Sequence, residues 1–405
     1  MDNQTKSGTF NEDGIVLNPW TAKGKFNDEL YQRLIKKFGV EPITQELIER
    51  FERVTGHKVH RLMRRGLFFA HRGLNEILDD VEAGKPIFLY TGRGPSGKDG
   101  KTLHVGHIVP MEFTVWLQKV FNAVVIFQIA DDEKFWFKDS KFDDIYELGK
   151  QNVKDIIALG FNPEKTFIFS NHDFKSYPAY KQVADELFNL VRVKDIQAIF
   201  GIPETAPSGQ LMWPIYQSTA AFSKAFGPIF EGQNVRCLVA YAIDQDPYFR
   251  LCRDFGPRLG FLKPCGIMCR FLPALEGDAK MSTTGVGPIK AVFMSDTPKQ
   301  IKKKINKYGF SGGQDTMELH RIHGGNTEVD VAFQWLRHFL EDDDEIEDIK
   351  RRYESGELLT GELKKICIGV VSKLALEHQE RRDQVTPEVF KEFCSYGDIV
   401  GYDNL

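Results

Sequence analysis

Apolar positions recur at helical spacing through the first part of the chain. Three charged stretches, 27–38, 44–51 and 73–82, have recurring apolar residues and are separated by short breaks. This spacing predicts amphipathic helices, each with one buried face. We therefore expect residues 1–84 to form an N-terminal helical extension.

The pattern changes at residue 85, where short and almost continuously apolar runs begin. These runs, with helical stretches between the earlier ones, cover 87–90, 123–130, 166–170, 235–243 and 266–272. Such alternation is typical of a parallel sheet, and strands without polar alternation fit a sheet that helices cover on both faces. The predicted fold class is α/β, with a Rossmann-type domain at 85–290 whose ligands bind beyond the carboxyl ends of the strands.

Beyond residue 290 the pattern is helical to the end of the chain. Amphipathic stretches span 330–340 and 359–380, and Thr297-Pro298 has the sequence of a helix cap followed by a first-turn proline. We expect an all-helical domain at 291–405, whose extreme C-terminus could pack back on the sheet domain.

Composition narrows the class of protein. The 405 residues suffice for two or three domains, and a formal net charge of −4 argues against a chain whose overall field attracts nucleic acid. Residues 1–14 lack the apolar core of a secretion signal, and no apolar run reaches the roughly 18 residues of a membrane span. We expect a soluble, cytoplasmic protein. Its six cysteines are expected to be reduced core residues rather than disulfides or metal ligands.

A glycine-rich loop follows the first apolar run and resembles two nucleotide-binding motifs that its context does not support. Gly92, Gly94 and Gly97 match the spacing of a dinucleotide fingerprint, but the next helix begins only seven residues after the third glycine. Residues 100–102 resemble the end of a P-loop, but Pro95 stands where its first glycine should be. A nicotinamide or flavin enzyme and a P-loop ATPase are therefore weak alternatives.

The segment His104-Val105-Gly106-His107 stands at the predicted start of the next helix. Free backbone N–H groups and the helix dipole favour a phosphate there. Gly106 lets an adenine ring lie close to the backbone, and two histidines three positions apart can donate hydrogen bonds to a phosphate that gains charge. The segment can therefore bind ATP, although such a short motif also arises by chance.

A second segment, Lys280-Met281-Ser282-Thr283-Thr284, follows the last predicted strand and has glycines on both sides. Glycines permit a mobile loop, and its lysine could swing onto a leaving pyrophosphate and neutralise charge. Taken alone, Lys280 would be an exposed surface lysine.

Together the two segments resemble the HIGH and KMSKS signatures of class I aminoacyl-tRNA synthetases, in the order and on the fold of those enzymes. Further segments resemble the eukaryotic and archaeal tryptophanyl-tRNA synthetases, namely 90–96, 130–134, 242–250 and 311–313. The resemblance runs from about residue 18 to the end of the chain. It departs at Thr283, where the signature has a second lysine, so the pyrophosphate contact of that lysine is absent.

Tyrosine is the nearest alternative substrate, because tyrosyl-tRNA synthetases share this architecture and both signatures. Tyrosyl-tRNA synthetases have an aspartate on a pocket helix, and this aspartate accepts a hydrogen bond from the phenol hydroxyl. This chain has Ala220 at that position, so the main reason to prefer tyrosine is missing. Indole instead needs an acceptor for one N–H donor among apolar walls. Tyr90 and Gln128, at predicted strand ends, match the family residues that contact the indole nitrogen.

The resemblance also implies the reaction and the remaining site residues. It implies activation of L-tryptophan by ATP, with Mg²⁺ bridging the phosphates and no metal ligand from protein side chains, and then transfer to tRNA(Trp). It implies a homodimer formed around the helix that follows His104, by an insertion in the catalytic domain 85–290. The expected catalytic residues are His104, His107, Lys280 and Ser282; ATP is expected to contact Arg93, Gly106, Asp244, Lys280 and Met281; tryptophan is expected to contact Tyr90, Gln128, Glu133, Gln217 and Gln245.

Binding of tRNA requires a local basic surface, because the overall balance is acidic. Lys302, Lys303 and Lys307, from a lysine cluster at 299–307, and Trp335 are the candidates for tRNA contact, in a helical domain that would bind the anticodon. A merely solvated helix face is the alternative for the lysines, and a core position is the alternative for Trp335. A synthetase-like protein that binds ATP without charging tRNA is the remaining alternative function.

Overall fold

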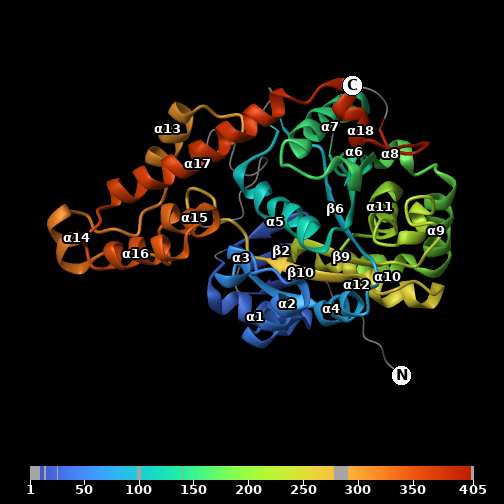
Figure 1. The fold of residues 1–405 in the computed structure, drawn as a ribbon, viewed down its shortest axis with the longest axis horizontal. Helices are drawn as coiled ribbons and strands as arrows, with labels where there is room; N and C mark the ends of the chain where they lie inside the picture. Colours follow the sequence, from blue (N-terminus) through green and yellow to red (C-terminus); the bar gives the residue numbers. More distant parts are fainter. Residues whose placement is uncertain are drawn as a thin grey trace.

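A seven-stranded sheet forms the centre of the computed structural model, which describes residues 10–12, 15–24, 26–97, 102–138, 140–277 and 291–402. Helices cover both faces of the sheet (Figure 1). In spatial order its strands are β4 (Glu41–Pro42), β5 (Phe68–Arg72), β10 (Cys265–Cys269), β9 (Arg236–Ala242), β6 (Ile87–Arg93), β7 (Val124–Ile129) and β8 (Thr166–Ser170). The five strands from β10 to β8 are parallel, and β5 and β4 add antiparallel pairs at the β10 edge. The predicted α/β fold with a parallel sheet is therefore confirmed.

The N-terminal part of the chain contains the predicted helices but is not purely helical. Its helices are α1 (Asp28–Phe38), α2 (Gln45–Thr55), α3 (Arg61–Arg64) and α4 (Leu74–Glu82). Strand β5 lies between them and pairs with β10, so this segment is built into the central sheet. The purely helical interpretation of residues 1–84 is wrong at this point, because β5 ends in the polar residues His71 and Arg72 and its short apolar run stands among helical stretches. A separate antiparallel sheet precedes α1, with strands β1 (Phe10–Glu12), β2 (Ile15–Asn18) and β3 (Thr21–Lys23).

The sheet separates two apolar cores. Along β6, Leu89 belongs to one core and its neighbours Phe88 and Tyr90 belong to the other, as alternation along a strand requires. The first core includes α5 (Val105–Phe121), and the second includes α9 (Pro178–Leu190), α11 (Ser208–Thr219) and α12 (Asp246–Phe255). Burial on both faces is why the parallel strands are apolar at successive positions.

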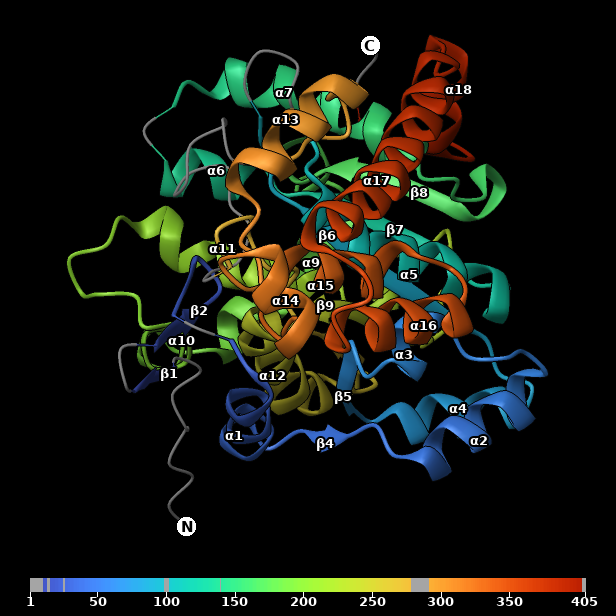
Figure 2. The same ribbon diagram turned by 90° about the vertical axis from the view of Figure 1, so that its left-hand side faces the viewer.

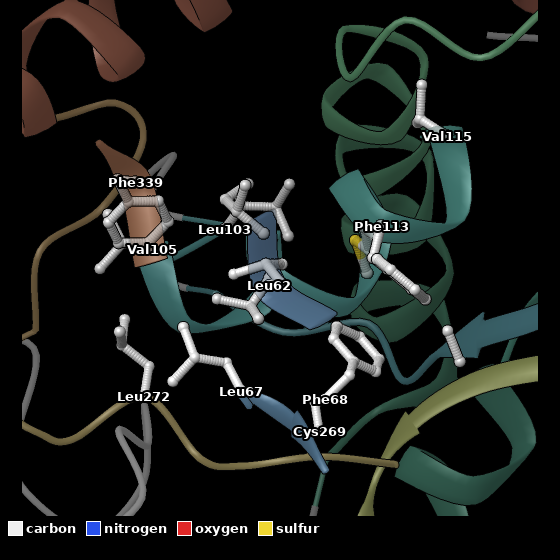
Figure 3. Packing of buried hydrophobic residues seen from close by; sticks show 14 of the residues in the cluster. Leu62, Leu67, Phe68, Leu103, Val105, Phe113, Val115, Cys269, Leu272 and Phe339 are labelled. Atoms are coloured by element: carbon white, nitrogen blue, oxygen red, sulfur yellow. The ribbon is translucent and has the colours of Figure 1, made fainter. Parts of the chain in front are cut away.

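The C-terminal helices share the first core with the sheet. Phe339 of α15 (Val331–Phe339) belongs to the same buried cluster as Leu103 and Leu272, and Figure 3 shows these side chains together with those of α5 and β5. Trp335 is completely buried there, and its Nε1 donates a hydrogen bond to the Pro273 carbonyl at 2.9 Å. The C-terminal lobe is therefore packed firmly on the segment between β10 and the helices that follow it.

Other helices of the described residues complete the layers around the sheet. Helices α13 to α17 extend to one side of it, as the two ribbon views show (Figures 1 and 2). Within the described ranges, no helix is long and apolar enough to cross a membrane. The remaining helices are α6 (Asp131–Phe137), α7 (Phe142–Ile157), α8 (Asn171–Phe174), α10 (Val193–Phe200), α13 (Pro298–Tyr308), α14 (Met317–His323), α16 (Asp343–Glu354), α17 (Thr360–Asp383) and α18 (Pro387–Phe393), with 3-10 turns at Pro163–Lys165, Ser223–Phe226, Ile243–Gln245 and Gly256–Leu259.

The end of the chain returns to the free edge of the sheet. A hairpin of β11 (Ser395–Tyr396) and β12 (Ile399–Val400) leads into it. The Ser170 backbone N–H donates to the Gly401 carbonyl at 2.8 Å, and the Tyr402 hydroxyl donates to the Tyr146 carbonyl at 3.0 Å. These contacts join the last residues to β8 and α7.

We predict that Lys304→Ala destabilises the protein far more than Lys303→Ala. Lys304 is buried on α13, and its Nζ lies 2.5 Å from the fully buried Asp296 carboxylate and 2.6 Å from the Ala291 carbonyl. Removing one partner of a buried ion pair leaves the other charge uncompensated, which costs about 3–5 kcal/mol. Lys303, one position earlier, is exposed, so its truncation should change stability by less than about 0.5 kcal/mol. Urea unfolding measures both values, and equal losses would refute the assigned role of this ion pair.

Candidate functional site

Two polar side chains from neighbouring strands meet, Tyr90 from the middle of β6 and Gln128 from near the carboxyl end of β7. The Tyr90 hydroxyl donates to Gln128 Oε1 at 2.5 Å, and the two residues are only 2% and 1% exposed. Burial raises the pKa of the Tyr90 hydroxyl well above its usual range, so this group stays protonated. Gly92 packs closely beside the pair, since a Cβ on it would lie 3.0 Å from the Gln128 carbonyl oxygen and 3.6 Å from the Tyr90 hydroxyl.

Residues that follow β8 extend this pair into a buried network. Gln128 Nε2 donates to Asn171 Oδ1 at 2.8 Å and to the Tyr180 hydroxyl at 3.1 Å. Tyr180 in turn donates to the Tyr216 carbonyl at 2.6 Å, next to Gln217 on α11. Neither Asn171 nor Tyr180 was predicted from the sequence. Asn171 does stand directly after an apolar strand, which is where ligands bind in a parallel sheet of this kind.

The turn between β2 and β3 contacts two of the predicted amino-acid ligands. Trp20 Nε1 donates to Glu133 Oε1 at 3.2 Å, and Gln245 Nε2 donates to the Pro19 carbonyl at 3.2 Å. The Trp20 ring stacks on Phe137, with ring centroids 4.6 Å apart. Glu133 follows β7 and Gln245 follows β9. The turn of the N-terminal sheet therefore lies where these two strands of the central sheet end. The sequence did not predict this contact.

The two signature histidines lie together at the start of α5. Their rings stack with centroids 3.4 Å apart and 24° between the planes, and the His104 backbone N–H donates to His107 Nδ1 at 3.3 Å. His104 is buried, whereas His107 and Gly106 are half-buried in the first turn. An anion placed at this helix start would meet the positive end of the helix dipole, although the His107 N–H already donates to the His104 carbonyl at 2.9 Å.

The chain that returns from the second signature segment runs beside His104. The Val105 N–H donates to the Val292 carbonyl at 3.0 Å, and the Met294 N–H donates to the Leu103 carbonyl at 2.8 Å. His104 forms an isolated antiparallel bridge with Phe293 between these two bonds. Lys280, Met281 and Ser282 themselves lie outside the described residues.

Arg93 holds the loop between β6 and α5 from inside the protein. Its Nε donates to Asn152 Oδ1 at 2.8 Å, and its Nη2 donates to the Thr102 carbonyl at 2.9 Å and to the Ser96 hydroxyl. Burial lowers the pKa of this guanidinium to about 9. We therefore interpret Arg93 as a residue that joins the two ends of the loop, rather than as a free phosphate ligand.

A buried carboxylate on α7 connects this loop to the C-terminal lobe. Asp155 accepts hydrogen bonds from the Thr102 hydroxyl, from His378 Nε2 at 3.2 Å and from Arg382 Nε at 2.7 Å. His378 and Arg382 lie near the end of α17, whose 24 residues span roughly 36 Å. The loop before His104 is thus fastened to α7 through Asn152 and to both α7 and α17 through Asp155. Sequence patterns gave no signal for these long-range contacts.

Other predicted residues occupy separate places. Asp244 is buried in the turn after β9, 1% exposed, and Ala220 is fully buried at the end of α11. Lys302, Lys303 and Lys307 are exposed on α13, but Lys304 of the same cluster is buried. Trp335 is a core residue, since its ring is 0% exposed. This corrects the expectation that Trp335 contacts tRNA.

All six cysteines are free and buried. Their expected position in the core is therefore confirmed. Burial raises the pKa of the Cys252 and Cys265 thiols to about 12, so these groups are not thiolates at neutral pH.

The chain is similar to known proteins over almost its whole length. Residues 82–374 match the family of tRNA synthetases class I (W and Y). Among curated proteins, the chain is 46% identical to the cytoplasmic tryptophan–tRNA ligase of Oryctolagus cuniculus, over 94% of this chain and 80% of the relative. It is 43% identical to the enzyme of the same name from Dictyostelium discoideum, over 94% and 95% of the two chains.

Solved structures are similar in fold as well as in sequence. The tryptophanyl-tRNA synthetase of Giardia lamblia matches with a TM-score of 0.85 and 40% identity, over 90% of this chain and 96% of the other. The structure of the Encephalitozoon cuniculi tryptophanyl-tRNA synthetase bound to tryptophan matches with a TM-score of 0.82 and 35% identity, over 90% and 97% of the two chains.

We predict that Asp155→Asn loosens the loop before His104. The amide cannot serve as the charged acceptor for Thr102, His378 and Arg382, so the free energy of unfolding should fall by about 2–4 kcal/mol. Hydrogen–deuterium exchange of the amides at 102–107 should become faster. The matched control is Asp144→Asn, an exposed carboxylate on the same helix, which should change neither. Unaltered exchange at 102–107 in the Asp155 variant would show that this carboxylate does not hold the loop.

Proposed function

Because the chain belongs to the tRNA synthetases class I of the tryptophan and tyrosine group, we propose that it is a tryptophan–tRNA ligase that uses ATP to join L-tryptophan to tRNA(Trp). The observation that carries the choice of tryptophan is the buried Tyr90–Gln128 pair. Similarity to relatives named cytoplasmic supports the same location for this protein.

The hydrogen-bonding groups of this pair suit an indole better than a phenol. The Tyr90 hydroxyl hydrogen is donated to Gln128, so its oxygen and the second lone pair of Gln128 Oε1 are the acceptors that remain for an N–H group. Ala220 offers no acceptor at the position where tyrosine enzymes carry their aspartate. A tyrosine side chain would therefore bury a hydroxyl without that specific partner, which a site of this kind rejects strongly.

We propose that residues around the strand ends bind the backbone groups of the amino acid and bind the nucleotide. Glu133, Gln217 and Gln245 would hold the α-ammonium and carboxylate of tryptophan. Asp244 would bind the ribose of ATP, and Gly106 would lie under its adenine. Met281 would complete the nucleotide site from the second signature segment.

The first step is attack of the tryptophan carboxylate on the α-phosphorus of ATP. A new bond forms from carboxylate oxygen to phosphorus, the bond to the bridging oxygen breaks, and pyrophosphate leaves with its negative charge. His104 and His107, at the positive end of α5, stabilise the charge on the phosphates, and Lys280 and Ser282 are proposed to act on the leaving group. Positioning and charge stabilisation are sufficient for such a transfer, so no covalent enzyme intermediate is needed.

We propose that Mg²⁺ enters with ATP, as part of the substrate. Over the described ranges, no three or more His, Cys, Asp or Glu side chains gather in a way that could hold a metal ion. The bound ion would screen charge on the phosphates, while the protein supplies the hydrogen-bond donors around them.

The second step moves tryptophan to RNA. A hydroxyl of the terminal ribose of tRNA attacks the adenylate carbonyl and AMP leaves. We propose 291–405 as the anticodon-binding domain and 85–290 as the catalytic domain with the insertion that forms a homodimer. The exposed ammonium groups of Lys302, Lys303 and Lys307 on α13 are the proposed RNA contacts in this part of the chain.

We predict strong ATP–pyrophosphate exchange with tryptophan and little with tyrosine or phenylalanine. The N–H acceptors at Tyr90 and Gln128 and the alanine at 220 favour tryptophan by at least about 100-fold in kcat/KM. The assay follows labelled pyrophosphate entering ATP, with a reaction lacking Mg²⁺ as control. Exchange with tyrosine at a comparable rate would refute the choice of tryptophan.

We predict that His107→Ala lowers the exchange rate by about 100-fold or more, because it removes a donor from the charged phosphates. His57→Ala, which truncates an exposed histidine, is the matched control and should leave the rate unchanged. Circular dichroism checks that both variants are folded. Full activity in a folded His107 variant would remove this residue from the mechanism.

A further inference from the structure

A chain of buried hydrogen bonds leads from the Tyr90–Gln128 pair to the carboxylate of Asp132 on α6. Gln128 Nε2 donates to Asn171 Oδ1 at 2.8 Å, and Asn171 Nδ2 donates to Asp132 Oδ2 at 2.8 Å. Tyr90, Gln128, Asn171 and Asp132 are each between 0% and 2% exposed. Water therefore cannot replace a partner that this chain loses.

The carboxylate determines the direction of every bond in the chain. An ionised carboxylate only accepts hydrogen bonds, so Asn171 must turn its NH₂ group towards Asp132 and its Oδ1 towards Gln128. Gln128 must then present its own NH₂ group to Asn171, which leaves Oε1 facing Tyr90. A reversed Gln128 amide would set two carbonyl oxygens against each other at Asn171 and lose two buried hydrogen bonds.

The Lys175 ammonium group and the His172 ring lie beside Asp132. Lys175 Nζ lies 2.9 Å and 3.1 Å from its two oxygens, and His172 Nδ1 lies 3.3 Å from Oδ1. The neighbouring Asp131 carboxylate makes its own bonds to the Ser170 hydroxyl and the His172 N–H, so the two acids do not compete for the same donors.

The last bond of the chain decides what the pocket offers to a ligand. Gln128 Oε1 can only accept, so the Tyr90 hydroxyl hydrogen points to it and the tyrosine oxygen is left as an acceptor. With the Gln128 amide reversed, its NH₂ group would donate to Tyr90, and the pocket would present a donor instead. A donor there would be unfavourable opposite an indole N–H group. It would no longer favour indole over a heterocycle that has sulfur or oxygen in place of the N–H.

We propose that Asp132 and Asn171 are positioning residues that make the pocket specific for an N–H donor by orienting the Gln128 amide. This inference rests on the proposed function, and it adds two residues that touch neither the amino acid nor ATP. The specificity of the pocket thus depends on a charge that lies two side chains behind the contacting groups.

The test compares tryptophan with its sulfur analogue β-(benzothiophen-3-yl)-alanine, which has the same shape but no N–H. Isothermal titration calorimetry gives the Kd of each ligand without the need for turnover. The wild-type protein should bind tryptophan at least about tenfold more tightly than the analogue. In Asp132→Asn and Asn171→Leu this ratio should fall to near one, mainly through weaker tryptophan binding.

The control variant is Asp185→Asn, on the helix that carries Tyr180, whose side chain is 58% exposed. It should keep the wild-type ratio, and the Kd for ATP should be the same in all variants. A purely structural role of Asp132 would weaken both amino acids equally and leave the ratio unchanged, which would overturn the inference.

If Asp132→Asn or Asn171→Leu does not fold, Tyr180→Phe tests the same proposal. It removes only the hydroxyl that accepts the second hydrogen bond of Gln128 Nε2, so the ratio should fall by a few fold. An unchanged ratio in this variant would again contradict the proposal. A wild-type protein that does not bind tryptophan would instead refute the proposed function. A wild-type protein that prefers tryptophan, with the same ratio in all variants, would refute only the role of the hydrogen-bond chain.

Discussion

Burial of the parallel sheet on both faces confines polar groups to the places where its strands end. Leu89 and Tyr90 are neighbours on β6 and belong to opposite apolar cores, so both faces of the strand are mainly apolar along its length. Polar side chains gather instead near the carboxyl ends, with Gln128 near the end of β7, Asn171 after β8 and Asp244 after β9. The candidate site follows from this constraint, because the parallel arrangement brings these ends to one edge.

The same constraint explains why the C-terminal lobe matters for the site. The lobe shares an apolar core with the sheet domain, since Trp335 and Phe339 pack in the cluster that also contains Leu103 and Val105. A direct polar contact is added by Asp155, which joins the loop before His104 to the end of α17. The helix that carries the two histidines is therefore held from the sheet side and from the helical lobe at once.

Regular periodicity allowed much of this architecture to be predicted from the sequence. The long amphipathic helices repeat their apolar positions often enough to be recognised, the five parallel strands are almost continuously apolar, and the first signature segment lies at the start of α5, as that fold requires. Strand β5 was missed because two of its five residues, His71 and Arg72, are polar, and its short apolar run stands among helical stretches. The burial of Lys304 and Trp335 could not be predicted from their own positions in the sequence. It depends on the side chains that other segments of the fold place around them.

Contacts between distant residues could not be predicted at all from one sequence. Gln128 and Asn171 are 43 positions apart, and Asp155 and His378 are 223 apart, so nothing in the local pattern connects them. The orientation of the Gln128 amide is a property of the whole network. Only the folded arrangement shows that a carboxylate behind the pocket determines which groups face the ligand.

The most direct test of the central claim, that this pocket selects tryptophan for transfer to tRNA, is a charging reaction in the presence of all twenty amino acids. Total tRNA, ATP and Mg²⁺ are added to the protein, and mass spectrometry identifies the amino acid that becomes esterified to RNA. The arrangement of Tyr90, Gln128 and Ala220 predicts tryptophan alone, on tRNA(Trp). Esterified tyrosine, or no esterified amino acid from a folded protein, would contradict it.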